Sequence, residues 1–305
     1  MQPLLSELVT AVSHVLLGKD QQVKLAIACL IGRGHLLIED LPGMGKTTLA
    51  HCLGKVLGLD YQRVQFTSDL LPADILGAAV FDKQQSTFNF HPGPIFTQLL
   101  LADEINRSTP KTQSALLEAM EEGQVSIEGE TRQLPTPFFV IATQNPTSQS
   151  GTFMLPESQL DRFLMRLSLG YPDQQSERLL LQGIDPRSRI NEMQPVLTHQ
   201  QLQSLQQQVT LVRCSDPLLD YLQKLVTFTR EDGRFTYGLS PRGALAWLSA
   251  AKAWALLADR DYVIPEDIQA VAPAVLGHRV RGDEVEQGHE HNNLIDYLLA
   301  SVAVI

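Results

Sequence analysis

The segment His35–Thr48 combines an apolar run, a glycine-rich turn and the start of a helical pattern. The turn ends in Gly45-Lys46-Thr47, and the helical pattern continues to Leu57. Small residues in such a turn let backbone N–H groups point toward a polyphosphate, the lysine reaches the outer phosphates, and the hydroxyl helps to hold Mg²⁺. The segment therefore predicts a strand–loop–helix unit that binds a nucleotide.

The match to the phosphate-loop pattern is imperfect at one position. The pattern Gly-x-x-x-x-Gly-Lys-Ser/Thr begins with glycine, and this chain has Asp40 there. A strand–turn–helix junction that only happens to end in Lys-Thr is the alternative interpretation. Other residues of the chain distinguish between a phosphate-binding loop and such a junction.

The first half of the chain carries five apolar, strand-like runs. Helical patterns separate several of them, and strands that alternate with helices indicate a parallel sheet covered on both faces. We therefore expect an α/β fold, an αβα sandwich on a five-stranded parallel sheet. The runs are His35–Glu39, Tyr61–Phe66, Gln98–Ala102, Phe138–Thr143 and Phe163–Leu169.

One helix and one hairpin of this half are marked by their end residues. Thr109 can cap a helix, Pro110 fits its first turn and Gly123 ends it. Glu121-Glu122, near the end of this helix, fit a solvated face. After the helix, apolar and polar residues alternate up to Glu128-Gly129, which predicts a short hairpin turn.

The composition changes after Tyr171-Pro172, which suggests a domain boundary. Residues 173–195 are rich in Gln, Ser, Arg and Pro, and helical patterns fill the chain from about Thr198. Ser240-Pro241 and Pro265 begin two of these helices. We expect an α/β core at 1–172, a linker at 173–195 and a smaller all-helical domain at 196–305.

The bulk properties exclude some classes of protein. A chain of 305 residues that is 44% hydrophobic can bury a sizeable core, and its net charge of −10 disfavours binding of duplex DNA by bulk charge. Cys29, Cys52 and Cys214 fit apolar fillers in a reducing compartment better than disulfides or a zinc site. Because no apolar stretch could span a bilayer and the first residues lack the pattern of a signal peptide, we expect a soluble cytoplasmic protein.

Two carboxylates, Asp103 and Glu104, follow the third apolar run. In parallel sheets, ligands bind at the carboxyl ends of the strands, where the loop after Glu39 also emerges. Asp103 would then hold Mg²⁺ through water, and Glu104 would polarise an attacking water. A solvated acidic turn is the alternative, but hydrolysis needs such a pair downstream of Gly45-Lys46-Thr47, in this chain order.

Three further residues fit a hydrolytic site, and each has a structural alternative. Asn145 could orient water against the γ-phosphate, or it could form a turn with Pro146. Arg162 could reach the nucleotide of a neighbouring subunit, or it could form a surface salt bridge. Arg242 stands in the first turn of a predicted helix, where its positive charge is unfavourable because it lies at the positive end of the helix dipole. A phosphate group is therefore its natural partner. The alternative is an arginine that is simply tolerated at the surface.

Together these residues resemble the MoxR family of AAA+ ATPases, in the clade with an insert in its second core helix. The resemblance runs from about Leu16 to Val280. An acidic residue at the position of Asp40 is familiar in such proteins, whereas Ile264 departs from them because the family often has a capping hydroxyl residue there. The motifs that carry the resemblance are Gly18-Lys19, Gly34-His35-Leu36-Leu37, Pro42-Gly43-Met44-Gly45-Lys46-Thr47, Gln65-Phe66-Thr67, Gly93-Pro94-Ile95-Phe96, Asp103-Glu104-Ile105-Asn106-Arg107, Gln144-Asn145-Pro146, Leu160-Asp161-Arg162-Phe163 and Ser240-Pro241-Arg242.

The resemblance implies a role for each candidate residue. The catalytic residues would be Glu104 of the Walker B pair, Asn145 as sensor 1, Arg162 as an arginine finger in trans and Arg242 as sensor 2. Thr47 and Asp103 would hold Mg²⁺, and Arg107 is a weaker trans-acting candidate. Residues 77–93 would form the insert, 125–134 the hairpin before sensor 1, and the helical domain the lid. The residues that bind the nucleotide would be Gly18, Lys19, Pro42, Gly43, Met44, Gly45, Lys46, Thr47 and Thr48.

The resemblance also implies how such a protein works. It would hydrolyse Mg-ATP as a ring, usually a hexamer, and act as a chaperone-like motor that remodels or activates a partner protein with a von Willebrand factor A domain. A helicase-like nucleic-acid motor, a magnesium-chelatase-like motor subunit and a non-hydrolytic binding ring are the alternatives. The acidic balance disfavours the nucleic-acid motor, and the intact Asp103-Glu104 pair disfavours the non-hydrolytic ring.

Overall fold

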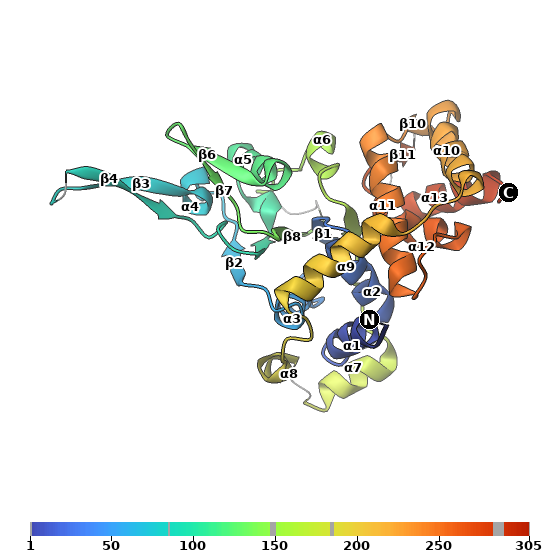
Figure 1. Cartoon of the computed structure of the whole chain (residues 1–305), viewed down its shortest axis with the longest axis horizontal. Coiled ribbons are helices and arrows are strands. Elements are labelled where there is room, and N and C mark those ends of the chain that lie inside the picture. The colour runs from blue at the N-terminus through green and yellow to red at the C-terminus, as the bar shows by residue number, and fades with distance from the viewer. Residues whose placement is uncertain (1, 85, 147–150, 184–185, 283–289, 305) are drawn as a thin grey trace.

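A five-stranded parallel sheet forms the centre of the computed structural model, which describes residues 2–84, 86–146, 151–183, 186–282 and 290–304 (Figure 1). The strand order is β2-β5-β8-β1-β9, and every neighbouring pair is parallel. The predicted sheet and its five strands are thus confirmed. The strands are β1 (Leu36–Glu39), β2 (Tyr61–Gln65), β5 (Leu99–Asp103), β8 (Phe139–Gln144) and β9 (Met165–Leu167).

Helices cover both faces of this sheet, because alternate strand residues point to opposite sides. Leu36 and Ile38 of β1 join the hydrophobic cluster with helices α2 and α3, whereas Leu37 joins a second cluster beneath α5. A sandwich of helix, sheet and helix results. The helices of this part are α1 (Gln2–Ser13), α2 (Asp20–Ile31), α3 (Lys46–Val56), α4 (Pro72–Leu76), α5 (Pro110–Glu122) and α6 (Glu157–Leu160), with a 3₁₀ turn, η1 (Ile105–Arg107).

Helix α5 begins and ends as its sequence predicts. The Thr109 side chain accepts a hydrogen bond from the Thr112 N–H at the start of the helix. Gly123 follows the last turn with a φ of 63°, a left-handed conformation that favours glycine. Both ends of the helix are therefore set by residues at its own boundaries.

Two β-hairpins project from the core. The predicted insert at 77–93 is a hairpin of β3 (Gly77–Asp82) and β4 (Thr87–Pro92), which extends away from the sheet (Figure 1). The predicted hairpin at 125–134 is also present, with β6 (Gln124–Ile127) and β7 (Glu130–Gln133). The Arg132 guanidinium lies 4.0 Å from the centre of the Phe90 ring, so the two hairpins are in contact.

The segment 173–195, predicted as a linker, contains two helices, α7 (Gln174–Leu181) and α8 (Pro186–Glu192). Asp173 caps α7 by accepting from the Ser176 N–H. The only residue of α7 that is buried is Ser176, so the helix gives little of the apolar periodicity by which helices are predicted from sequence. The boundaries at 172 and 196 stay predictions.

The described part of the C-terminal region is mostly helical. A short antiparallel ribbon of β10 and β11, which was not predicted from the sequence, lies among the helices. Strands of three and two residues are too short to show an alternating pattern in the sequence. The elements are α9 (His199–Leu211), α10 (Asp216–Glu231), β10 (Phe235–Tyr237), α11 (Pro241–Leu257), α12 (Pro265–Leu276), β11 (Arg281–Gly282) and α13 (Glu290–Ser301).

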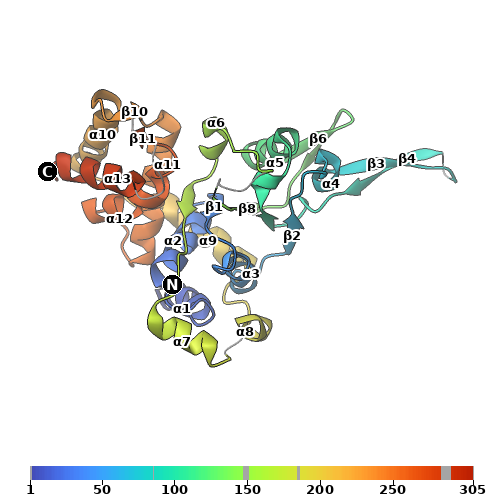
Figure 2. The same cartoon turned by 180° about the vertical axis from the view of Figure 1, so that it is seen from behind.

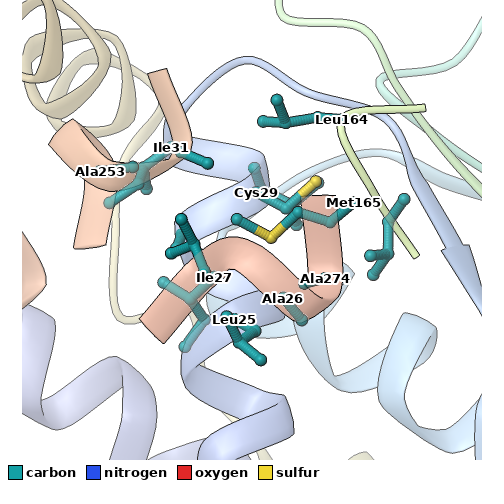
Figure 3. Close-up of a cluster of buried hydrophobic side chains, with 14 of the residues drawn as sticks. Leu25, Ala26, Ile27, Cys29, Ile31, Leu164, Met165, Ala253 and Ala274 are labelled. Carbon is teal, nitrogen blue, oxygen red and sulfur yellow. The ribbon is translucent and has the colours of Figure 1, made fainter. Parts of the chain in front are cut away.

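The helical part shares one hydrophobic cluster with the α/β core, with α2 at the junction (Figure 3). Cys29 of α2 and Met165 of β9 belong to this cluster together with Ala253 of α11 and Ala274 of α12. Figure 2 shows the helical group and the insert hairpin at opposite ends of the molecule. Cys29, Cys52 and Cys214 are free, and the first two are fully buried, as expected for apolar fillers.

None of the helices in the described ranges is both long and apolar enough to cross a membrane.

Candidate functional site

The loop between β1 and α3 lies at the carboxyl edge of the sheet. Gly43 and Gly45 have φ angles of 86° and 92°, which L side chains rarely adopt. Gly45 immediately precedes α3, which begins at Lys46. Since the first N–H groups of a helix have no partner within it, this loop presents free donors and the positive end of a helix dipole to an anion.

Lys46 is almost fully buried, with 7% of its surface exposed. Its Nζ donates to the Asp40 carbonyl at 2.5 Å, to Asn145 Oδ1 at 2.7 Å and to the Gln144 carbonyl at 3.3 Å. Burial lowers the pKa of Lys46, and the nearby carboxylates of Asp40 and Asp103 oppose this shift. The lysine therefore stands between the ends of β1 and β8, next to the glycine-rich loop.

Asn145 connects this lysine to the predicted Walker B pair. Its side-chain Nδ2 donates to Glu104 Oε1 at 2.8 Å while its oxygen accepts from Lys46. Glu104 has a φ of 57°, an uncommon conformation for a residue with a side chain, and such strain is concentrated at functional sites. Lys46, Asn145 and Glu104 thus form one hydrogen-bonded chain along the sheet edge.

Thr143 fixes both carboxylate residues from the neighbouring strand. Its hydroxyl donates to Asp103 Oδ1 at 2.6 Å and accepts from the Glu104 N–H at 2.9 Å. The sequence prediction did not include Thr143. The available signal was its position in β8, two residues before Asn145. Because β8 pairs with β5, this position brings the Thr143 hydroxyl to the carboxylates at the end of β5.

Two residues of the edge strand β2 also reach the carboxylates, and neither was predicted as a site residue. Arg63 donates to Asp103 Oδ2 through Nη2 at 2.6 Å and Nε at 3.1 Å. Gln65 donates to Glu104 Oε2 at 2.9 Å. The alternation of Arg63 and Gln65 places both on one side of the strand, but only the pairing of β2 with β5 shows which carboxylates they meet.

Arg107 pairs within its own chain in this structure. Its Nε lies 3.0 Å from Glu104 Oε2. Glu104 is therefore surrounded by three donors, from Gln65, Arg107 and Asn145.

The donor set at this edge fits Mg²⁺. Asp103 offers a carboxylate, a hard oxygen ligand of the kind that Mg²⁺ prefers, and its Oδ2 binds the Arg63 guanidinium in this structure. Thr47 offers a hydroxyl in the first turn of α3. Within the described residues, no group of three or more His, Cys, Asp or Glu side chains could hold a metal ion by itself. Such a site suits Mg²⁺ that arrives with phosphate oxygens, since Mg²⁺ often binds one or two carboxylates plus substrate phosphates.

Asp40, the departure from the phosphate-loop pattern, has a structural role. Its Oδ2 accepts from the N–H groups of Leu169 and Gly170 at 2.7 and 2.6 Å and from the Ser168 hydroxyl at 3.1 Å. Its Oδ1 accepts from the Leu41 N–H at 2.8 Å. Asp40 does not have a positive φ, so its backbone does not require glycine. The carboxylate ties the start of the loop to the segment after β9.

We expect Asp40→Ala to lower the free energy of unfolding by about 3 kcal/mol, because buried N–H groups that lose their acceptor cost about 1–3 kcal/mol each. Urea denaturation followed by circular dichroism measures the effect. Asp220→Ala, at an exposed position of α10, is the matched control and should change stability by less than about 0.5 kcal/mol. Equal stability of the two variants would contradict the anchoring role.

Gly18 and Lys19, predicted to lie near the adenine, pack against the start of α7. A Cβ at Gly18 would lie 2.6 Å from the side chains of Asp173 and Ser176, so the close approach requires glycine. Lys19 Nζ donates to the Tyr171 carbonyl. Burial lowers the pKa of Lys19, against the opposing effect of Asp40 and Asp173. The structure thus places this pair beside the segment that follows β9.

The two predicted arginines, Arg162 and Arg242, lie together. Arg162 Nη2 is 3.0 Å from Glu121 Oε2, and Arg242 Nη1 is 3.1 Å from Glu121 Oε1. The prediction that Glu121 belongs to a solvated face missed this role, because the glutamate binds one arginine from the core and one from the helical part. Its partners are distant in sequence, so no local pattern indicated them.

This arginine pair lies at the opposite edge of the sheet from Lys46. His35, the residue before β1, bonds to the carbonyl of Met120 at 3.2 Å, and its own carbonyl accepts from the Leu164 N–H at 2.9 Å. These contacts place the C-terminal end of α5 and the segment after Arg162 at the start of β1. Lys46, in contrast, follows the end of that strand. The four residues of β1 span about 13 Å. Neither arginine pairs with the Lys46 edge of its own chain.

The parallel sheet, the glycine-rich loop before α3 and the carboxylates at the end of the neighbouring strand define a P-loop ATPase with a C-terminal helical lid. Residues 35–165 match the model of the "ATPase family associated with various cellular activities (AAA)", and residues 227–296 match the AAA lid domain. The chain belongs to the MoxR family of AAA+ ATPases, and it is therefore an ATPase.

Relatives that align with nearly the whole chain support this assignment. YeaC of Bacillus subtilis is 46% identical over 92% of this chain and 88% of that protein. Chaperone MoxR1 of Mycobacterium tuberculosis is 39% identical over 88% of this chain and 73% of its own. A crystal structure from Cytophaga hutchinsonii, of a protein assigned as an ATPase, matches 100% of this chain and 96% of that chain with a TM-score of 0.88 and 35% identity.

Proposed function

We propose that this ATPase hydrolyses Mg-ATP as a ring and uses the reaction to remodel or activate a partner protein. The observation that carries the proposal is the hydrogen-bonded chain from Lys46 through Asn145 to Glu104, with Asp103 beside it. It brings a phosphate-binding lysine, a polar amide and a carboxylate to one edge of the sheet. These are the parts that phosphoryl transfer to water requires.

In the proposed mechanism, the phosphates of ATP lie against residues 42–48, which form the glycine-rich loop and the first turn of α3. Lys46 turns from Asn145 to the outer phosphates, which frees the Asn145 amide to orient water. Glu104, on its strained backbone, accepts a proton from that water or polarises it. Gly18 and Lys19 lie near the adenine in this proposal.

Thr47 and Asp103 would hold Mg²⁺. The ion, when bound with ATP, supplies positive charge that neutralises the phosphate oxygens. Arg63 then has to share or leave the Asp103 oxygen that it binds in this structure.

Ring formation is supported by the position of the arginines. Arg162 and Arg242 lie at the edge of the sheet that faces away from the Lys46 edge of the same chain, so a second copy is needed to bring them to a nucleotide. Arginine supplied in trans stabilises the charge that develops on the transferred phosphoryl group. We propose that both arginines serve the neighbouring subunit, in a ring that is a hexamer by analogy with the family.

A protein client is supported by the chaperone name of the mycobacterial relative. By analogy with the family, we propose a partner with a von Willebrand factor A domain and a cytoplasmic setting. The insert and the second hairpin, joined by the contact between Phe90 and Arg132, are the projecting elements that could reach a client. No observation in the described residues favours a nucleic-acid motor over this role, and the net charge of −10 disfavours it.

Sedimentation of the Glu104→Gln variant with Mg-ATP tests the ring. We expect the 33.8-kDa chain to form a discrete larger species, because a nucleotide that is held without turnover completes the contact with the arginines of a neighbour. Lys46→Ala, which lacks the phosphate contact, is the control and should not respond to ATP. If Glu104→Gln stays monomeric at every ATP concentration that saturates it, the ring proposal is wrong.

DNA binding tests the alternative function. Tight, salt-sensitive binding of single-stranded or duplex DNA would favour the nucleic-acid motor instead.

A further inference from the structure

Arg279, in the helical part, is a buried arginine whose partners surround Arg162. Only 4% of its side chain is exposed. Its Nη2 donates to the carbonyls of Asp161 and Phe163, at 3.1 and 2.6 Å, and its Nη1 donates to the Leu164 carbonyl at 3.1 Å. The guanidinium therefore binds the backbone on both sides of Arg162.

An ion pair completes this arrangement. Arg279 Nε donates to Asp161 Oδ1 at 2.7 Å. A planar guanidinium holds several acceptors in a fixed geometry, which a lysine ammonium does not reproduce. His278, the preceding residue, bonds to the same Phe163 carbonyl at 3.0 Å through its Nε2. The backbone of residues 161–164 is thus fixed by two consecutive residues that follow α12.

The same carboxylate also connects to Arg242. Asp161 Oδ2 accepts a long hydrogen bond from the Ser240 hydroxyl at 3.4 Å, and Ser240 is the N-cap of α11, accepting from the Gly243 N–H at 2.9 Å. Arg242 is the second residue of α11. Gly243 has no Cβ, and one placed there would lie 3.1 Å from Arg279 Cδ, so α11 lies close against the Arg279 side chain.

The two arginines are therefore joined at both ends. Arg279 and Asp161 connect the backbone beside Arg162 to Ser240, the N-cap of the helix that carries Arg242, and Glu121 pairs with both arginine side chains. A displacement of the helical part relative to the sheet would move residues 161–164 as well, since Arg279 also donates to the carbonyl of Val275 in α12 at 2.6 Å. Arg166 of β9 adds a further bond between the two parts, to the Gly277 carbonyl.

We propose that Arg279 is a positioning residue that holds Arg162 and Arg242 as one unit, so that both reach the nucleotide of a neighbouring subunit in a single geometry. This inference rests on the proposed role of the arginines in trans. Because Arg279 itself is buried, it acts through Arg162 and Arg242. A displacement of about 1 Å in a catalytic group can cost about 10²-fold in rate.

The test is Arg279→Lys in the full-length protein, measured as steady-state ATP turnover. We expect kcat to fall about 10- to 100-fold and the KM for ATP to stay within about twofold, because the Lys46 edge of the same chain is intact. Adding Lys46→Ala subunits should restore part of the turnover, since they supply correctly placed arginines. Adding Arg279→Lys to a protein that already carries Arg162→Ala and Arg242→Ala should cause no further loss, because residues that act through one another are not additive.

Arg260→Lys is the matched control. Arg260 pairs with Asp267 through two contacts, at 2.5 and 2.6 Å, within the helical part and away from residues 161–164. The Arg260→Lys substitution should lower thermal stability, as Arg279→Lys does, but it should leave kcat within about twofold of the unsubstituted protein. If Arg279→Lys does not yield folded protein, Asp161→Asn keeps a side-chain acceptor and should show the same pattern of lower kcat, unchanged KM and rescue by Lys46→Ala.

Three results would overturn the positioning role. They are a normal kcat in a folded Arg279→Lys protein, a loss carried by KM alone, or a further loss when Arg279→Lys is added to the Arg162→Ala, Arg242→Ala protein. Full turnover in Arg162→Ala itself would instead contradict the proposed function, so the two failures are distinguishable.

Discussion

Glu104→Gln should lower ATP turnover by about 10²- to 10⁴-fold, the range that a positioned general base contributes, while ATP still binds. Glutamine has the size of glutamate and can still accept from Asn145, but it carries no negative charge with which to polarise water. Residues 42–48, which include Lys46, are untouched, so the contacts proposed for the phosphates remain. The substitution should therefore lower kcat and leave the affinity for ATP unchanged.

A coupled phosphate-release assay measures the turnover, and titration with a fluorescent ATP analogue measures the binding. Glu118→Gln, an exposed glutamate of α5, is the control and should keep normal turnover. Unchanged turnover in Glu104→Gln would remove the role assigned to Glu104. Loss of binding together with turnover would show that the substitution disrupts the site.

The sequence predicted the elements that depend on local patterns. The central strands β1, β5 and β8 are apolar runs with almost every residue buried, and the ends of α5 are set by Thr109, Pro110 and Gly123, each of which has a local physical reason. The glycine-rich loop could be predicted for the same reason, because Gly43 and Gly45 adopt conformations that favour glycine. What remained hidden was the reason for Asp40, whose partners lie in the segment after β9.

The ion pairs of the site could not be predicted, because each joins residues that are far apart in the chain. Arg63 meets Asp103 only when β2 pairs with β5. Glu121 looks like any other glutamate at the end of a helix until the fold brings Arg162 and Arg242 to it. Without the strand order and the position of the lid, the sequence offers many equivalent charge pairs and no means of choosing among them.

Arg162→Ala should lower ATP turnover by about 10³-fold, the lower end of the range for an arginine that acts in trans. ATP binding should be unchanged, because Arg162 lies about one strand length from the Lys46 edge of its own chain. The folded state should lose little, since the pair with Glu121 is partly exposed and such pairs contribute about 0–1 kcal/mol. Arg178→Ala, at an exposed position of α7, is the control and should keep normal turnover.

Mixing Arg162→Ala with Lys46→Ala separates action in trans from action within one chain. The first variant keeps an intact phosphate loop, and the second keeps an intact arginine. If the arginine serves a neighbour, a mixed ring contains complete sites and the turnover should rise above that of either variant alone. If Arg162 acted on its own nucleotide, no mixture could contain a complete site, and the absence of rescue at any ratio would contradict the shared site. Mixing Arg242→Ala with Lys46→Ala should show rescue with the same dependence on the ratio of subunits, because Arg242 shares Glu121 with Arg162 and is proposed to serve the same neighbouring site.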